Sequence, residues 1–268
     1  MPGSQPLRIE RDRYNRDVTT SLDDSPDCGD SSPDRPAAVQ ADQRAEAAGD
    51  RATVVTIDGP AGTGKSTVAR RVAERLGYAF LDTGAMYRAV ALLCLDRGVD
   101  PSDPTAAGGL VDSVGMVDGH LCVDGKRAGD QLRTLEVTQA ASLVAQHSTV
   151  RQRLVDLQRE FGRRQPIVTE GRDQGTVVFP SAGHKFFLSA SVEERARRRQ
   201  RELESIGREV DLAELTEQIR ERDDRDQSRA VAPLRPADDA TQVDTTSLTM
   251  DEVVDHLVRL CRGEPASR

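Results

Sequence analysis

Residues 57–67 read IDGPAGTGKST: an apolar segment leads into a glycine-rich turn and then into a lysine and two hydroxyl residues. Segment 59–66 matches the pattern Gly-x-x-x-x-Gly-Lys-Ser/Thr, with strand-like residues before it and helix-like residues after it. Glycines let backbone N–H groups turn inward around phosphate oxygens, and the positive end of the following helix points to the same place. The sequence therefore predicts a loop that binds a triphosphate, with ATP and Mg²⁺ as the expected occupants.

The residues expected to contact ATP are those of the loop itself. They are Gly59, Pro60, Ala61, Gly62, Thr63, Gly64, Lys65, Ser66 and Thr67. Lys65 is expected to reach the β- and γ-phosphates and to act in catalysis, while the Ser66 hydroxyl is expected to bind Mg²⁺. The remaining Mg²⁺ ligands are left open, with Asp58, Asp82 and Asp173 as candidates that would approach the metal directly or through water. Such a loop identifies a phosphoryl donor and not a reaction, because GTPases, motors, transporters and small-molecule kinases all carry one.

Composition narrows the classes of protein to consider. The net charge of −8 and the aromatic content of 3% argue against nucleic-acid binding, which favours basic grooves and aromatic platforms. The only asparagine is Asn15, so the Asn-Lys-x-Asp motif that reads guanine in GTPases is absent. The four cysteines lie far apart, no apolar run could span a membrane, and the N-terminus has no signal-peptide core. We expect a cytoplasmic monomer without a membrane or nucleic-acid partner.

The first 50 residues differ from the rest of the chain. They hold five prolines, one aromatic residue, and eleven acidic against six basic residues. Such a segment buries too little apolar surface to offset its ordering entropy, so residues 1–50 are predicted to form a disordered acidic tail.

From Arg51 onward, short apolar segments alternate with helical ones, which is typical of a parallel α/β sheet. Strands are predicted within 53–58, 79–83, 165–171, 184–190 and 241–246. Helices are predicted within 66–77, 84–98, 191–204 and 247–263, and a further helical region is predicted to run from 131 through 164. Residues 100–140 interrupt this alternation with glycine-rich turns and short alternating pieces, which predicts a small β-rich insert between core segments 51–99 and 141–268.

Two charged segments admit more than one interpretation. SVEERARRRQRELE, at 191–204, is either a solvated helix with ion pairs such as Glu193–Arg197 and Glu194–Arg198, or a mobile lid that closes over ATP. ERDDRDQSRAVAPL, at 221–234, is less helix-like after Gln227 and suits a turn that faces a ligand.

Arginines near strand ends and in helix-to-loop segments suggest a second anionic pocket. They are Arg88, Arg151, Arg172, Arg222, Arg225 and Arg229. For any one arginine, a solvated surface charge is the commoner outcome. An enzyme that moves a phosphoryl group onto another phosphate needs such cations to neutralise the spreading charge. Several arginines in these positions therefore favour a phosphate acceptor.

Five blocks of sequence together resemble a known family. They occur in the order IDGPAGTGKST, LDTGAMYRA, EGRDQGTVVFP, FLSASVEERARRR and ERDDRDQSRAVAPL. They resemble the bacterial cytidylate kinases, nucleoside monophosphate kinases that convert CMP and dCMP to the diphosphates with ATP, and the resemblance covers about 52–262. It implies a three-layer P-loop kinase fold with a parallel central sheet, a monophosphate-binding insert at 100–140 and a helical lid near 191–210.

The resemblance also implies an acceptor site for CMP. Its residues would be Thr83, Tyr87, Arg88, Ser142, Arg151, Arg172, Asp173, Arg222, Asp226 and Arg229. Arg172, Asp173 and Arg229 would act in catalysis with Lys65. Thr83 stands where the family commonly has serine, and either hydroxyl can bind the acceptor. Which of Ser142 and Arg151 reaches the base, and which of Asp173 and Asp226 reads the cytosine amino group, are left open.

The reaction implied by the resemblance is the conversion of ATP and CMP to ADP and CDP. Two alternatives are another small-molecule P-loop kinase, such as an adenylate or shikimate kinase, and a non-catalytic nucleotide-binding module. The blocks GRDQGT and RDDRDQSRAVAPL argue against the first, and ADP production on addition of CMP would exclude the second.

Overall fold

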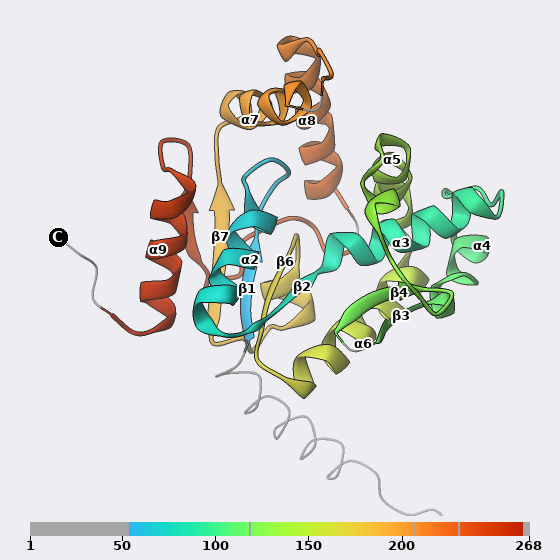
Figure 1. Ribbon diagram of the computed structural model, residues 1–268, viewed down its shortest axis with the longest axis horizontal. Coiled ribbons are helices and arrows are strands. Elements are labelled where there is room, and N and C mark those ends of the chain that lie inside the picture. Colours follow the sequence, from blue (N-terminus) through green and yellow to red (C-terminus); the bar gives the residue numbers. More distant parts are fainter. Residues whose placement is uncertain (1–53, 118, 206, 230, 265–268) are drawn as a thin grey trace, which may run out of the picture.

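The computed structural model describes residues 54–117, 119–205, 207–229 and 231–264, so the tail expected at 1–50 lies outside the described residues. A five-stranded sheet in the order β2-β6-β1-β7-β8 forms the centre, and every pair of neighbouring strands is parallel (Figure 1). Its strands are β1 (Val54–Asp58), β2 (Ala79–Asp82), β6 (Ile167–Gly171), β7 (His184–Ser189) and β8 (Thr241–Asp244). The predicted strands are therefore confirmed, with ends that differ by a few residues.

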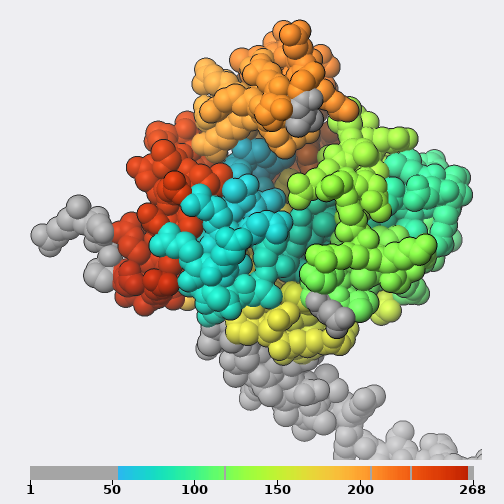
Figure 2. Space-filling view, viewed as in Figure 1, coloured from blue at the N-terminus to red at the C-terminus, as the bar shows by residue number. Residues whose placement is uncertain are grey.

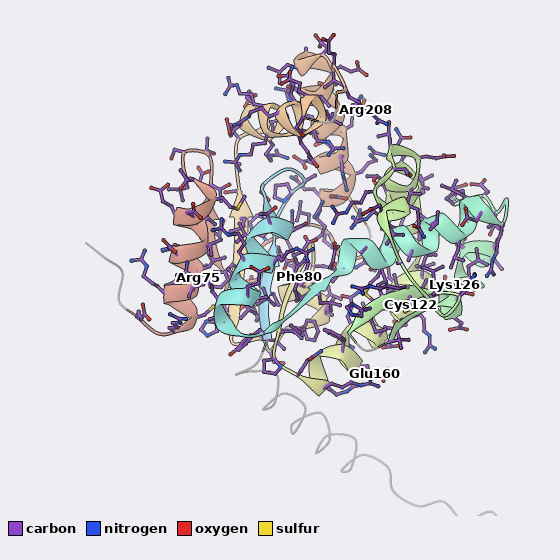
Figure 3. All side chains as sticks on the ribbon, viewed as in Figure 1. Arg75, Phe80, Cys122, Lys126, Glu160 and Arg208 are labelled. Atoms are coloured by element: carbon purple, nitrogen blue, oxygen red, sulfur yellow. The ribbon has the colours of Figure 1, made fainter. Side chains whose placement is uncertain are left out.

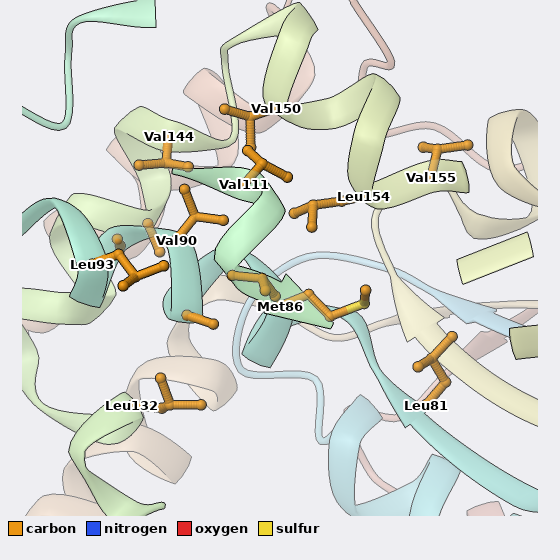
Figure 4. Packing of buried hydrophobic residues seen from close by; sticks show 14 of the residues in the cluster. Leu81, Met86, Val90, Leu93, Val111, Leu132, Val144, Val150, Leu154 and Val155 are labelled. Carbon is orange, nitrogen blue, oxygen red and sulfur yellow. The ribbon is translucent and has the colours of Figure 1, made fainter. Parts of the chain in front are cut away.

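Helices cover both faces of the sheet. All five residues of β1 are buried, as expected of a parallel strand that is covered on both sides. Val54 packs with residues of α3, α5 and α6, whereas Val55 and Ile57 pack with α2 and α9. These helices are α2 (Lys65–Leu76), α3 (Thr83–Asp96), α5 (Leu135–Val144), α6 (Ser148–Arg164) and α9 (Met250–Cys261). Figure 4 shows the first of these clusters, in which side chains from α3, α5 and α6 meet. The predicted three-layer α/β class is confirmed.

The segment predicted as a β-rich insert contains a second, antiparallel sheet. It follows the short helix α4 (Pro104–Gly108) and consists of β3 (Val114–Val117), β4 (His120–Val123) and β5 (Lys126–Arg127). Asp124 and Gly125 join β4 to β5 with positive φ angles of 48° and 73°, as Asp-Gly hairpin turns do. Cys122 of this sheet is buried and Lys126 is exposed (Figure 3). That this insert binds the nucleoside monophosphate remains a prediction.

The prediction of one helical region from 131 through 164 is wrong in one respect, because the structure has two separate helices there, α5 and α6. The chain leaves the helical path after α5, and His147 adopts an extended conformation before α6 begins. The His147 Nε2 atom lies 2.8 Å from the backbone oxygen of Pro101. Neither glycine nor proline marks this break in the sequence. The break lets α5 pack along α3, whereas α6 packs mainly against α4 and also contacts α3 and β3.

Two further helices, α7 (Val192–Glu204) and α8 (Leu212–Gln227), pack on each other above the loop that follows β1 (Figure 1). Ala196, Leu215 and Ile219 form the small apolar core between them. Helix α8 was not among the predicted helices, but it ends at Gln227, after which the sequence is predicted to be less helix-like. Within the described part of the chain, no helix combines the length and hydropathy that crossing a bilayer requires.

Candidate active site

A cleft of about 410 Å³ opens beside the carboxyl ends of β1 and β6. Figure 2 shows the surface hollowed where α7 and α8 (orange), α2 (cyan) and α5 (green) approach one another. The residues predicted to contact ATP or CMP line this cleft except Gly59, Pro60 and Thr63. Of the arginines suggested for the second anionic pocket, Arg225 does not line it, because its side chain lies on the exposed side of α8. Thr63 is buried, and its hydroxyl donates a hydrogen bond to the backbone oxygen of Pro60 at 3.1 Å.

The phosphate loop, residues 59–67, favours glycine at three positions, since Gly59, Gly62 and Gly64 all have positive φ angles. A Cβ atom at Gly59 would lie 2.0 Å from the backbone oxygen of Leu188 in β7, so no larger residue fits there. Gly64 precedes α2 in the left-handed region, with φ of 87°, and no side chain of the described residues caps this helix. The first backbone N–H groups of α2 are therefore left for an anion.

Lys65 is buried at the base of the loop. Its Nζ donates a hydrogen bond of 2.6 Å to the backbone oxygen of Pro60 and lies 3.5 Å from the Thr63 hydroxyl. Burial lowers the pKa of Lys65 to about 7, and repulsion by the charge of Arg172 is the second-largest cause. A bound phosphate would favour the charged ammonium, because an opposite charge nearby offsets both effects.

A hydroxyl–carboxylate pair lies next to the loop. The Ser66 hydroxyl donates a hydrogen bond of 3.0 Å to Oε1 of Glu170. Glu170 lies on β6, which neighbours β1 and places Glu170 opposite Ile57. Glu170 was not among the predicted site residues, although an acidic residue at the end of the apolar strand 167–171 resembles the metal-binding acid of P-loop enzymes.

These residues suit Mg²⁺ by their chemistry. No three His, Cys, Asp or Glu side chains gather as a metal site among the residues that the structure describes. Mg²⁺ usually takes one or two carboxylates together with substrate phosphates and water, so it needs no cage made entirely of protein. The oxygen donors of Ser66 and Glu170, beside a phosphate loop, fit that requirement.

One carboxylate holds two arginines on the opposite wall of the cleft. Asp226 of α8 accepts a 2.8 Å hydrogen bond from Nε of Arg172, and its other oxygen pairs with Arg229. Burial alone would raise the pKa of Asp226, but Arg172 and Arg229 lower it below its usual value. Arg222 lies on the same helix, where burial lowers its pKa to about 10.

Several guanidinium donors on this wall are not satisfied. The buried Nε atoms of Arg88, Arg222 and Arg229 have no hydrogen-bond partner among the described residues. Buried donors without partners are costly, and they are common where a ligand completes the site. The arrangement therefore suits an anionic acceptor.

A second ion pair lies deeper in the cleft. Arg151 donates from Nη2 to Oδ2 of Asp173, and its guanidinium lies 5.8 Å from the centre of the Tyr87 ring. Burial raises the pKa of the Asp173 carboxyl. The neighbouring backbone is fixed by Asp58 of β1, which accepts hydrogen bonds from the N–H groups of Gln174 and Gly175 at 2.9 and 2.7 Å.

The remaining predicted acceptor residues come from α3 and α5. The Thr83 hydroxyl donates a hydrogen bond of 2.7 Å to the backbone oxygen of Glu170. Arg88 pairs with Asp82 at 3.2 Å, and Ser142 of α5 lines the cleft. Several other residues that line the cleft were not among the predicted site residues. They are Gly84, Thr138, Ala141, Ala145, Glu170, Gly171 and Glu202.

The arginines of α7 do not reach over the cleft in this structure. Arg195 binds the backbone oxygen of Ala61, Arg198 pairs with Glu194, and only Glu202 of this helix lines the cleft. The Glu194–Arg198 pair is thus confirmed. The Glu193–Arg197 pair is wrong, because Glu193 pairs with Arg220 of α8 and Arg197 lies 3.8 Å from Glu194.

A parallel sheet whose first strand enters a phosphate loop, together with an arginine-lined pocket on the same cleft, defines a P-loop phosphotransferase. The profile of the family described as cytidylate kinase matches residues 55–263. The chain belongs to the cytidylate kinase family.

Curated relatives agree with this assignment. The chain is 49% identical over 211 residues to a cytidylate kinase of Methylococcus capsulatus, covering 76% of this chain and 95% of the relative. It is 50% identical over 205 residues to a cytidylate kinase of Nitratidesulfovibrio vulgaris, covering 75% and 88%. A bifunctional pantoate ligase/cytidylate kinase of Synechocystis is 47% identical over 219 residues, which cover 78% of this chain and 43% of that protein.

Proposed function

We propose that this protein transfers the γ-phosphoryl group of ATP to CMP and dCMP, giving ADP with CDP or dCDP. The observation that carries the proposal is one cleft with two anion-binding walls. The phosphate loop with Lys65 forms one wall, and arginines with unsatisfied buried donors form the other. Membership of the cytidylate kinase family supports the same reaction.

We call the wall formed by the phosphate loop the donor wall, and the opposite wall with Arg172, Arg222 and Arg229 the acceptor wall. The donor wall would hold ATP through the N–H groups of the phosphate loop and through Lys65. Ser66 and Glu170 are the residues that would hold Mg²⁺. When bound, Mg²⁺ neutralises negative charge on the phosphate oxygens. Lys65 would exchange its contact with the Pro60 carbonyl for one with the triphosphate.

The acceptor wall would align CMP rather than activate it. The nucleophile is a phosphate oxygen that is already ionised at neutral pH, so a strong general base is not required. Asp226 fixes Arg172 and Arg229 in the cleft, so that little reorganisation is needed when charge spreads over the transferring group. We propose that Arg172 and Arg229 contact this group and that Arg88, Arg151 and Arg222 contribute to holding the acceptor.

Base selectivity is proposed to rest on Asp173. Both oxygens of Asp226 already bind arginines, whereas in Asp173 only Oδ2 binds Arg151. Oδ1 of Asp173 makes no hydrogen bond within the described residues, and we propose that it accepts one from the cytosine amino group. Uracil places an acceptor at that position, and a buried acceptor left facing another is strongly disfavoured. Comparison of CMP with UMP tests this role, and equal kcat/KM values would contradict it.

Several features remain proposals that accompany this function. They are a monophosphate-binding insert at 100–140, a lid near 191–210, a monomeric state, a cytoplasmic location, and nucleotides as the partners rather than nucleic acid or a membrane.

Product analysis tests the proposed reaction directly. ATP, Mg²⁺ and CMP should yield ADP and CDP in equal amounts, and omission of CMP should abolish ADP formation. ATP binding without any ADP formation would instead support a non-catalytic module. Activity that requires an acceptor other than CMP or dCMP would support a different P-loop kinase.

A further inference from the structure

Arg195 lies where α7 meets the phosphate loop and the end of β7. The side chain is almost completely buried. Its Nε donates a hydrogen bond of 3.0 Å to the backbone oxygen of Ala190, and its Nη1 donates one of 3.1 Å to the backbone oxygen of Ala61. Because Ala61 lines the cleft, this guanidinium fixes a carbonyl of the loop that would bind ATP.

The same guanidinium holds a carboxylate of α8. Nη1 of Arg195 lies 2.6 Å from Oδ2 of Asp223, and both side chains are buried. The other carboxylate oxygen of Asp223 has no hydrogen-bond partner in the described part of the chain, which leaves Arg195 as the group that fixes this side chain. Arg222 precedes Asp223, and Asp226 follows one helical turn later; both line the cleft.

We propose that Arg195 is a positioning residue that couples ATP binding at the phosphate loop to the acceptor residues of α8. A buried ion pair is costly to break, because each partner would be left uncompensated. Movement of the Ala61 carbonyl is therefore transmitted through Arg195 and Asp223 to α8. This inference rests on the proposed function, since it assigns ATP to the loop and CMP to the acceptor wall.

The coupling predicts that each nucleotide increases the affinity of the protein for the other. ATP orders the loop, which holds Arg195 against Asp223 and so fixes Arg222 and Asp226 for CMP. By thermodynamic linkage, CMP must tighten ATP binding by the same factor. Arg195 acts in this scheme without touching either nucleotide.

Arg220 provides a matched control. It also joins the two helices, pairing with Glu193 at 3.3 Å, but this pair is more than half exposed and does not touch the phosphate loop. Exposed pairs contribute little, so Arg220→Gln should leave communication between the nucleotides unchanged.

The experiment measures the dissociation constant of CMP by calorimetry, with and without saturating Mg²⁺ and an ATP analogue whose β–γ bridge is methylene. For the wild-type chain we expect the analogue to lower the dissociation constant of CMP about tenfold, which is within the usual range of such couplings. The double variant Arg195→Met/Asp223→Leu removes both buried charges together, which proteins tolerate better than the loss of one. In the double variant, the analogue should change the dissociation constant of CMP by about twofold or less. In Arg220→Gln, it should change this constant by the same factor as in the wild type.

The outcomes separate this inference from the proposed function. If the wild-type chain binds both nucleotides without mutual tightening, the coupling does not exist. If the folded double variant keeps the wild-type factor and only its thermal midpoint changes, Arg195 is merely structural. Should the double variant not fold, Asp223→Asn takes its place, and retention of the full factor there overturns the inference. Failure of the wild-type chain to bind CMP at all overturns the proposed function itself.

Discussion

Nε of Arg172 lies 2.8 Å from Oδ2 of Asp226, although Arg172 follows β6 and Asp226 lies near the end of α8. Arg229 occupies the other oxygen of the same carboxylate. Asp226 thus holds Arg172 and Arg229 of the acceptor wall in fixed positions. These two side chains are therefore already oriented by the fold.

Arg172→Lys should lower kcat/KM for CMP by about a hundredfold or more while changing the KM for ATP only a few-fold. Lysine keeps the charge but lacks the planar fork that binds a carboxylate and a phosphate together. Steady-state kinetics with each substrate varied in turn measures both effects. Arg225→Lys, at an exposed position on α8, is the control and should behave like the wild type. Unchanged CMP kinetics in Arg172→Lys would exclude Arg172 from the site.

Lys65→Ala should reduce kcat by about a thousandfold, because it removes a cation aimed at the charge that develops on the transferring phosphoryl group. The fold should persist, since the loop conformation depends on its glycines and on packing against β7. Turnover and circular dichroism of the purified variant test both statements, with the exposed Lys126→Ala as control. A variant that kept near-normal turnover would refute the assigned role.

Glu170→Gln should raise the Mg²⁺ concentration needed for half-maximal activity by about tenfold or more, as expected when a group that binds or orients a metal ligand is changed. The amide keeps the shape of the side chain but loses the negative charge near Ser66. Activity titrated with Mg²⁺ at saturating nucleotide measures this shift. Glu160→Gln, on the exposed side of α6 (Figure 3), should leave the titration unchanged. Identical titrations for both variants would remove Glu170 from the metal site.

Asp58 should make stability depend on pH. Burial raises its pKa from 3.8 to about 7, with opposing contributions from the N–H groups of Gln174 and Gly175 and a smaller influence of Asp173 and Lys65. Between these values the folded chain binds more protons than the unfolded chain, so its free energy of unfolding falls as the pH rises. The contribution of Asp58 is thus fully present below pH 3.8 and is lost as the pH rises through about 7.

The Asp58→Asn variant tests this dependence, because asparagine does not titrate. Urea unfolding at several pH values between about 4.5 and 6.5 should give a flatter profile for the variant than for the wild type, in the window set by the two pKa values. Parallel profiles would show that Asp58 does not titrate with a raised pKa in the folded chain.

Local patterns were sufficient to predict the strands and the phosphate loop. The loop is predictable because its glycines answer local backbone requirements: Gly59 has no room for a Cβ atom and Gly64 adopts a left-handed conformation. Strand β1 is predictable because both of its faces are buried, so its residues form a nearly continuous apolar run in the sequence.

Features that depend on tertiary contacts were not predictable in the same way. The break before α6 accompanies the packing of α5 on α3, and no glycine or proline marks it in the sequence. Glu193 pairs with Arg220 of another helix instead of the residue one turn away, so helical spacing gave the wrong partner. The position of Glu170 at the end of an apolar strand was a signal in the sequence, but its place beside the phosphate loop depends on the pairing of β6 with β1.

The most direct test of the central claim is the rate of ADP formation with CMP, dCMP, UMP and AMP as acceptors, measured as kcat/KM at saturating ATP and Mg²⁺. The account predicts that CMP and dCMP are used best, with UMP and AMP lower by about a hundredfold or more, as expected when a buried polar partner is left unpaired. A clear preference for AMP, or no turnover with any of the four, would contradict it.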